Sequence, residues 1–319
     1  MKSNSFFACV AVAAFCTAMN VYAQVESDPE SAEDKKVFDA IGQVGRFVKD
    51  DEGYLIFEGG CSAALIANDK VISEGYCLYD EDSGQHVPEM HYFVHSKERE
   101  NIVIKLQESP TRNWKDLASY GITVRKISSG IFYPGKKEPI PGDPDLAFEY
   151  GFEKNDIAIS QLASPINFLT PIQVANAKLT RSIASGDEMI VVNYDRFAPF
   201  SDDGYVPLKK LAIDKLQALS YESCSQRVTP SNGSKLSKKF ICAYAPQQPK
   251  PCLDSSNNLY FYRDSEGGKL NLAGFPGYSH QANGRESCTK DNTVIELSNR
   301  MSGIAGWFDW ASGLSYSIK

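Results

Sequence analysis

Short runs of β-branched and aromatic residues, separated by Gly, Pro, Asn and Asp, recur along this chain from about residue 37 onward. They read YLIF, AALIA, KVIS, HYFVH, NIVIKL, DIAIS, EMIVV and LNLAGF. Runs of this kind are typical of β-strands joined by turns. A helical pattern occurs only near the end, at about residues 303–312, and no repeat has a fixed period. The sequence therefore predicts an all-β fold with a short C-terminal helix.

The predicted strands cover too many residues for one small barrel. Two β-barrels or sandwiches of about 120 residues each fit the length better. We place the first barrel at about residues 37–172 and the second at about 173–300, with the join around residues 165–179. Residues 81–152 are rich in charge, Pro and Gly and are expected to carry surface insertions, which often determine specificity.

The N-terminal residues have the build of a secretory signal peptide. One lysine precedes a short apolar run at residues 6–16, and small residues follow at 21–23. We predict cleavage after residue 23; a membrane anchor is the alternative, but polar residues interrupt the short run. Residues 24–36 (QVESDPESAEDKK) have almost nothing to bury, which predicts a disordered leader or propeptide. A protease could trim it after Lys36, leaving a domain over 37–319.

Six cysteines remain once the signal peptide is removed: Cys61, Cys77, Cys224, Cys242, Cys252 and Cys288. An even number of cysteines in an oxidising compartment predicts three disulfides, with free or metal-bound thiols as the alternative. The four histidines, His86, His91, His95 and His280, do not combine with the cysteines at zinc-finger spacing. We therefore predict no metal and no cofactor.

Charge and hydropathy narrow the classes of partner. The formal net charge is −7 and the lysines are scattered, which disfavours nucleic acid. Beyond the signal peptide no apolar run approaches the about 20 residues that cross a bilayer, so we expect no membrane association. Asn232 begins the sequon Asn-Gly-Ser and is a candidate glycosylation site. We expect an extracellular monomer whose partner is a protein or peptide.

Four motifs follow one another in a fixed order: CSAALI at 61–66, SEGYC at 73–77, NDIAISQL at 155–162 and DSSNNLY at 254–260. Together with the cysteines, they resemble CGGSLI, TAAHC, NDIALLKL and DSGGPLY of the chymotrypsin/trypsin-like serine proteases. The resemblance covers nearly everything from about residue 37 to the C-terminus. It implies two six-stranded antiparallel β-barrels. It also implies three disulfides, which pair Cys61 with Cys77, Cys224 with Cys242 and Cys252 with Cys288.

The resemblance implies a triad in which a serine attacks, a histidine moves its proton and an aspartate orients the histidine. Asp156 matches the aspartate and Ser255 the serine, but Tyr76 stands at the histidine position. A phenol with a pKa near 10 is already protonated at pH 7 and cannot be the general base. Loss of that base costs about a million-fold in rate, or about 8 kcal/mol of barrier. Asp156 and Ser255 are then vestigial, a buried carboxylate and an ordinary turn serine.

The residues around Ser255 depart from the family further. The family makes its oxyanion hole from backbone N–H groups in a glycine-rich turn. Here one residue fewer separates Cys252 from Asp254, Leu253 is nearest to the missing glycine, and residues 256–258 (Ser-Asn-Asn) replace Gly-Gly-Pro. We expect a misformed hole in which these side chains crowd the place where a substrate backbone approaches.

The specificity pocket also departs from the family. Its wall corresponds to Gly277, Tyr278 and Ser279, where the serine side chain would narrow the entrance. Its base corresponds to Lys250, which favours an acidic guest if it points inward and is otherwise a solvated loop lysine. Cleavage after Lys36 would make Val37 the new amino terminus, which could pair with Asp254. Asp254 could instead be a structural hydrogen-bond acceptor.

Three hypotheses of function remain. The first is a secreted, catalytically inactive homologue that acts by binding, motivated by the joint changes at Tyr76, Leu253, Ser256 and Asn257. The second is an active serine endopeptidase in which another group activates Ser255. The third is an exported storage or structural protein with no saturable partner.

Overall fold

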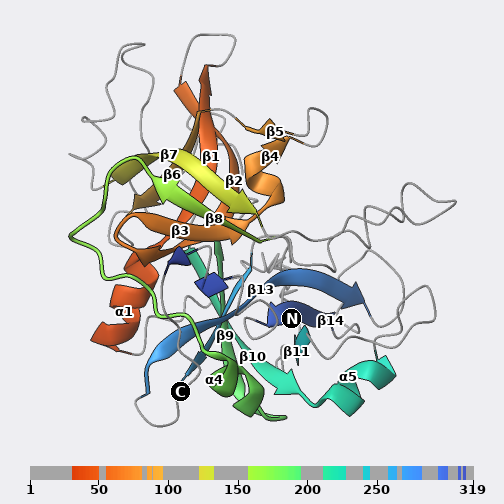
Figure 1. Ribbon diagram of the computed structural model, residues 1–319. Helices are drawn as coiled ribbons and strands as arrows, with labels where there is room; N and C mark the ends of the chain where they lie inside the picture. Colours follow the sequence, from red (N-terminus) through yellow and green to blue (C-terminus); the bar gives the residue numbers. More distant parts are fainter. Residues whose placement is uncertain are drawn as a thin grey trace, which may run out of the picture.

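The computed structural model describes residues 31–49, 55–80, 85–87, 89–95, 122–132, 157–194, 211–227, 240–244, 258–263, 268–281, 294–300, 308–309 and 312–313. These residues form two closed six-stranded barrels, one above the other in Figure 1. Neighbouring strands in both barrels are antiparallel. The predicted all-β double barrel is confirmed.

The first barrel has the strand order β1-β2-β3-β8-β7-β6. Its strands are β1 (Ile41–Lys49), β2 (Leu55–Ala67), β3 (Lys70–Glu74), β6 (Met90–His95), β7 (Ile122–Phe132) and β8 (Ile157–Leu162). Between β3 and β6 lie the 3-10 helix η1 (Tyr76–Leu78) and a small sheet of β4 (Tyr79–Asp80) and β5 (Gln85–His86). The predicted strand NIVIKL, at residues 101–106, lies outside the described residues.

The second barrel has the strand order β10-β11-β14-β13-β12-β9. Its strands are β9 (Glu188–Tyr194), β10 (Leu211–Leu219), β11 (Phe240–Tyr244), β12 (Leu259–Arg263), β13 (Leu270–Gln281) and β14 (Val294–Arg300). Two short helices, α4 (Ala177–Ser182) and α5 (Tyr221–Arg227), lie outside the strands in Figure 1. Residues 308, 309 and 312 are helical, within the predicted C-terminal helix at 303–312.

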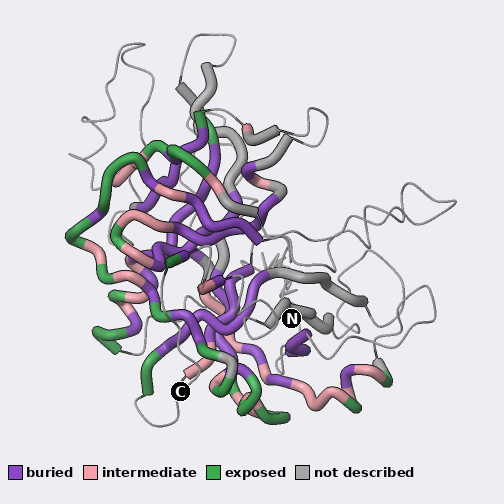
Figure 2. The backbone as a smooth tube through the Cα atoms, in the orientation of Figure 1, coloured by how far each residue is buried: buried purple, intermediate pink, exposed green. Residues whose placement is uncertain are grey.

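Burial follows the strands of both barrels (Figure 2). In β3 every residue after Lys70 is buried, and β8 is buried at all positions except Gln161. Strands covered on both faces read as continuous apolar runs without alternation. This explains why KVIS and IAIS carry so few polar residues.

The segment between the barrels binds to both of them through its main chain. Ile172 N donates to Leu65 O of β2 at 2.7 Å, and Ala175 N donates to Leu272 O of β13 at 2.8 Å. Val174 forms a parallel bridge with Leu272. The connection is therefore part of the contact between the barrels, and buried residues of both barrels belong to one apolar cluster.

The helix α1 (Ala32–Asp39) corrects the expectation that residues 24–36 form a disordered leader. Residues 31–36 are ordered, and the helix continues through Val37 to Asp39. Ser31 caps its first turn by accepting a hydrogen bond from Asp34 N at 3.1 Å. Composition indicates how much apolar surface a segment can bury, whereas this helix also buries the charged side chain of Asp34. Residues 24–30 lie outside the described residues.

Within the part of the chain that the structure describes, no helix has the length and apolar character needed to cross a bilayer.

Candidate functional site

The candidate site begins where β3 ends and β8 starts. Glu74, the last residue of β3, pairs with Ile157, the first residue of β8. Tyr76 follows two residues later as the first residue of η1. Asp156 directly precedes Ile157 in the sequence and lies outside the described residues. The end of β3, which leads to Tyr76, and the start of β8, which Asp156 precedes in the sequence, thus lie at the same end of this strand pair.

Most of the predicted serine loop lies outside the described residues. This applies to Lys250, Cys252, Leu253, Asp254, Ser255, Ser256 and Asn257, and also to Cys288 and the candidate glycosylation residue Asn232. The loop is followed at once by described residues, beginning with Asn258 and β12.

Asn258 itself corrects one expectation about this loop. Its side chain is 0% exposed, and its Nδ2 donates to Tyr260 Oη at 3.3 Å. It is therefore buried in the second barrel and does not crowd a substrate path. The amide therefore has a polar partner inside the barrel, which makes a polar residue tolerable at this position.

The predicted pocket wall, Gly277, Tyr278 and Ser279, belongs to β13. Its pairing with β14 shifts register between Pro276 and Tyr278, so that Tyr278 pairs with Leu297 and Ser279 with Glu296. Such a shift bends a strand and redirects the residues beyond it. The side chains of these three residues lie outside the described part of the structure.

Two of the three predicted disulfides are present. Cys61 of β2 is bonded to Cys77 of η1, and Cys224 of α5 to Cys242 of β11, each with Cα atoms 6.1 Å apart. That separation is ordinary for a disulfide. The predicted bond between Cys252 and Cys288 lies outside the described residues.

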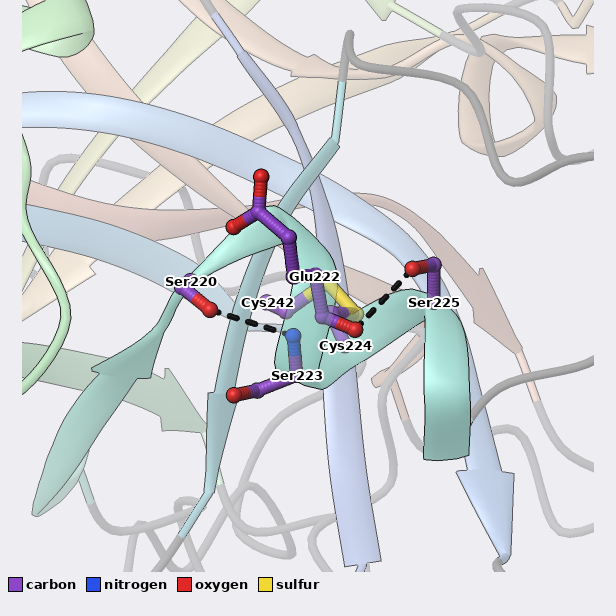
Figure 3. Close-up of a disulfide and its surroundings, with 6 residues drawn as sticks. All are labelled: Ser220, Glu222, Ser223, Cys224, Ser225 and Cys242. Atoms are coloured by element: carbon purple, nitrogen blue, oxygen red, sulfur yellow. Dashed lines mark hydrogen bonds between the residues drawn. A yellow bond between two sulfur atoms is a disulfide. The ribbon is translucent and has the colours of Figure 1, made fainter.

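The second disulfide fastens α5 to the barrel (Figure 3). Ser220 Oγ accepts a hydrogen bond from Ser223 N at 3.1 Å, and Ser225 Oγ donates to Glu222 O at 3.0 Å. Cys224 itself is fully buried, whereas the serines and Glu222 are not. The bond therefore holds a polar helix against the barrel through one buried side chain.

Glu74 is a candidate functional residue that the sequence interpretation missed. Its side chain is only 4% exposed, and a carboxylate oxygen lies within 4.8 Å of the sulfur atoms of Cys61 and Cys77. Because these sulfurs are bonded to each other, they offer no thiolate to a metal ion. A buried carboxylate is costly and often marks a functional site. The only signal in the sequence was an acidic residue that ends an apolar strand, two positions before Tyr76.

His91 does not stand in for the missing histidine. It lies on β6, three strands from β3 in either direction around the closed barrel. Its side chain is buried, and this desolvation lowers the pKa of the imidazole, with opposing contributions from Glu89. Lys126 lowers that pKa further, and it also lowers the pKa of Glu89, to which it is hydrogen bonded at 2.7 Å. His91 is thus a neutral, buried residue of the barrel wall at pH 7.

Val37, the predicted new amino terminus, lies inside α1. Its carbonyl accepts a hydrogen bond from Ala40 N at 3.1 Å, and the chain continues directly into β1. In this arrangement the nitrogen of Val37 is an amide within a helix, so it has no amine to offer to Asp254.

Comparison of the sequence with known protein families agrees with the double-barrel architecture. The family model for trypsin matches residues 48–253, which include both described disulfides and the positions of Tyr76 and Asp156. The match ends two residues before Ser255. No curated protein matches the chain. With most of its length matched and two antiparallel six-stranded barrels in place, the chain belongs to the trypsin family.

Proposed function

We propose that this protein is a secreted member of the trypsin family that does not hydrolyse peptide bonds and acts by binding an extracellular protein or peptide. The observation that carries the proposal is Tyr76, which begins η1 two residues after β3 and matches the family's histidine position in the sequence. A phenol at that position cannot accept the proton of Ser255 at neutral pH.

The preserved local backbone supports this reading of Tyr76. β3 keeps its register with β8, and the Cys61–Cys77 disulfide closes beside Tyr76. Both features support the interpretation that Tyr76 stands where the family has its histidine.

The N-terminal helix gives independent support. The resemblance implies that active members of the family insert a new amino terminus beside the aspartate that precedes the serine. Here the corresponding Val37 is held in α1, and Asp34 and Phe38 of the same helix are buried. This burial supports a protein in which Val37 stays within the helix and no new amino terminus forms.

Secretion and the partner class belong to the same proposal. The N-terminal residues 1–23 and the disulfides support an exported protein. The acidic net charge of −7 supports a partner other than nucleic acid, and the absence of a second long apolar run in the sequence supports a protein that stays off membranes. We propose a monomer whose long insertion at 81–152 contributes to recognition.

Labelling with a fluorophosphonate probe tests this proposal. The wild-type protein, Ser255→Ala and Tyr76→His are compared, with an active trypsin as the positive control. We expect no labelling of wild type above Ser255→Ala. Labelling at Ser255 in the wild type would overturn the proposal. Restored labelling in Tyr76→His would show that the oxyanion hole is intact and that the base alone is missing.

A second candidate function, an active serine endopeptidase with an atypical base, is favoured by one observation. The buried carboxylate of Glu74 lies two residues from Tyr76 and next to the Cys61–Cys77 disulfide. In this alternative, Glu74 would accept the proton of Ser255 as its Oγ attacks the scissile carbonyl carbon. It requires that Glu74→Gln abolish a Ser255-dependent labelling seen in the wild type. If the wild type is not labelled, this candidate is excluded.

A further inference from the structure

Helix α1 is fastened to the second barrel by an ion pair between residues 229 positions apart. Arg263 Nη1 donates to Asp34 Oδ1 at 3.1 Å, and Arg263 Nη2 donates to Asp34 Oδ2 at 3.0 Å. Asp34 is 2% exposed, and Arg263 Nη1 also donates to Gly268 O at 2.6 Å. Two parallel hydrogen bonds between a guanidinium and a carboxylate fix both direction and distance.

An aromatic contact lies beside this ion pair. Phe38 meets Phe261 edge to face, with ring centroids 6.4 Å apart and an interplanar angle of 88°. Asp34 and Phe38 are four residues apart on the helix, a rise of about 6 Å. Phe261 and Arg263 are two residues apart on β12, a rise of about 6.7 Å. The two spacings match, so one helix face and one strand face meet at two points.

The residue after the helix is bound to the first barrel. Ala40 O accepts hydrogen bonds from Leu65 N of β2 and from Tyr92 Oη of β6, both at 3.0 Å. Ala40 itself is fully buried, and β1 starts at the next residue. Seven consecutive residues, from Asp34 to Ala40, thus connect the second barrel to the first.

We infer that α1 is a retained clamp between the two barrels and that the functional protein keeps the bond between Lys36 and Val37. Lys36 lies between the two fastening points, Asp34 and Phe38. Its side chain is exposed and pairs with Glu33 at 2.6 Å, so a protease can reach the lysine side chain. Its main chain, however, is helical. Cleavage there would cut the main chain between Asp34 and Phe38, so that Asp34 would no longer be tethered to the buried Phe38. The lysine pair at 35–36 therefore lies in a protected segment and is not a processing signal.

The test is limited digestion of the mature, secreted protein with a lysine-specific endopeptidase, followed by mass spectrometry of the bonds after Lys35 and Lys36. The variants are Asp34→Asn, Arg263→Met and the double variant. Glu188→Gln is the matched control, because Glu188 pairs with Lys215 at 3.4 Å on the exposed surface of the same barrel. A synthetic peptide of residues 31–44 gives the rate of cleavage without the fold.

We expect the wild-type protein to be cut at least tenfold more slowly than the peptide. Asp34→Asn and Arg263→Met should each speed cleavage at Lys36 at least fivefold and lower Tm by about 5 °C. The double variant should lose no more than the more strongly affected single variant, because both substitutions remove the same interaction and the double variant leaves no unpaired charge. Glu188→Gln should change neither quantity. Arg263 is far from Lys36 in the sequence. Faster cleavage after Lys36 in Arg263→Met therefore distinguishes a clamp from a helix that is stabilised only by its own cap.

Two outcomes overturn the inference. One is a rate of cleavage in Arg263→Met within twofold of wild type. The other is a secreted protein that already begins at Val37. If the variants do not fold, the comparison of wild type with the peptide decides, since equal rates mean that α1 is not held.

Discussion

Phe38 of α1 packs edge to face against Phe261 of β12, and both side chains are buried in the cluster that joins the barrels. This contact gives the N-terminal helix an apolar anchor beside its buried ion pair. It also places Phe38, which lies two residues beyond the predicted end of the leader, in the core of the protein. Removing one partner of such a contact should change the stability of the protein by a measurable amount.

Replacement of Phe38 by alanine should lower the free energy of unfolding by about 3 kcal/mol, because it leaves a cavity against Phe261. Urea unfolding followed by tryptophan fluorescence measures the change. Phe168→Ala is the control, since Phe168 is 68% exposed and should cost less than about 0.5 kcal/mol. Equal effects of the two substitutions would contradict the burial of Phe38.

Removal of the disulfide between Cys224 and Cys242 by the double substitution to serine should cost about 3 kcal/mol of stability. The bond closes a loop with a sequence separation of 18, and opening it increases the conformational freedom of the unfolded chain. Thermal unfolding of the oxidised proteins measures the loss. A variant as stable as the wild type would show that α5 is held by other contacts.

His91 predicts a pH dependence of stability. Burial lowers the pKa of His91 below the ordinary 6.5 of a histidine, with Glu89 opposing this change and Lys126 adding to it. The unfolded chain therefore binds the proton more tightly, so His91 lowers stability as the pH falls from 6.5 through the folded pKa and costs nothing above 6.5.

We expect the difference in unfolding free energy between about pH 7.5 and about pH 5.5 to be smaller in His91→Gln than in the wild type. Urea unfolding at the two pH values measures it. His280→Gln, in the second barrel, is the control. An unchanged difference in His91→Gln would show that other groups carry the pH dependence.

Gly42 of β1 should not tolerate a side chain. A Cβ there would contact the carbonyl oxygen of Phe93 and approach the Tyr92 ring to 2.6 Å. Gly42→Ala should lower the free energy of unfolding by about 2 kcal/mol, because a backbone oxygen cannot move aside cheaply.

Gly313→Ala provides a contrast to Gly42→Ala. Gly313 has φ +63° and open space around it, so its substitution should cost about 1 kcal/mol through backbone strain alone. Chemical denaturation of both variants measures the difference. A smaller loss for Gly42→Ala than for Gly313→Ala would contradict the close packing of β1 against β6.

Some features could be predicted from sequence because they depend on local pattern and composition. Strands such as KVIS and DIAIS are runs whose residue types fit a buried pleated sheet, and they became β3 and β8. The inability of Tyr76 to act as a base depends only on the acidity of a phenol. The two described disulfides followed from a family pattern in cysteine spacing.

Other features depend on partners that are distant in the chain. The sequence around Asp34 indicated only a polar leader, and its helix is explained by Arg263, which β12 brings to it. The sequence predicts that Asn258 crowds the place where a substrate backbone approaches, but the start of β12 directs it into the barrel toward Tyr260.

The sequence by itself thus determined the class of fold, and it predicts the candidate positions of the site, with Tyr76 in place of a histidine. Only the tertiary structure decided which charged and polar side chains are buried: Asp34 against Arg263, Glu74 beside a disulfide, and His91 in the barrel wall. The physical reason is that desolvation of a polar group depends on what covers it. In a barrel, the covering residues come from strands that are far apart in the sequence.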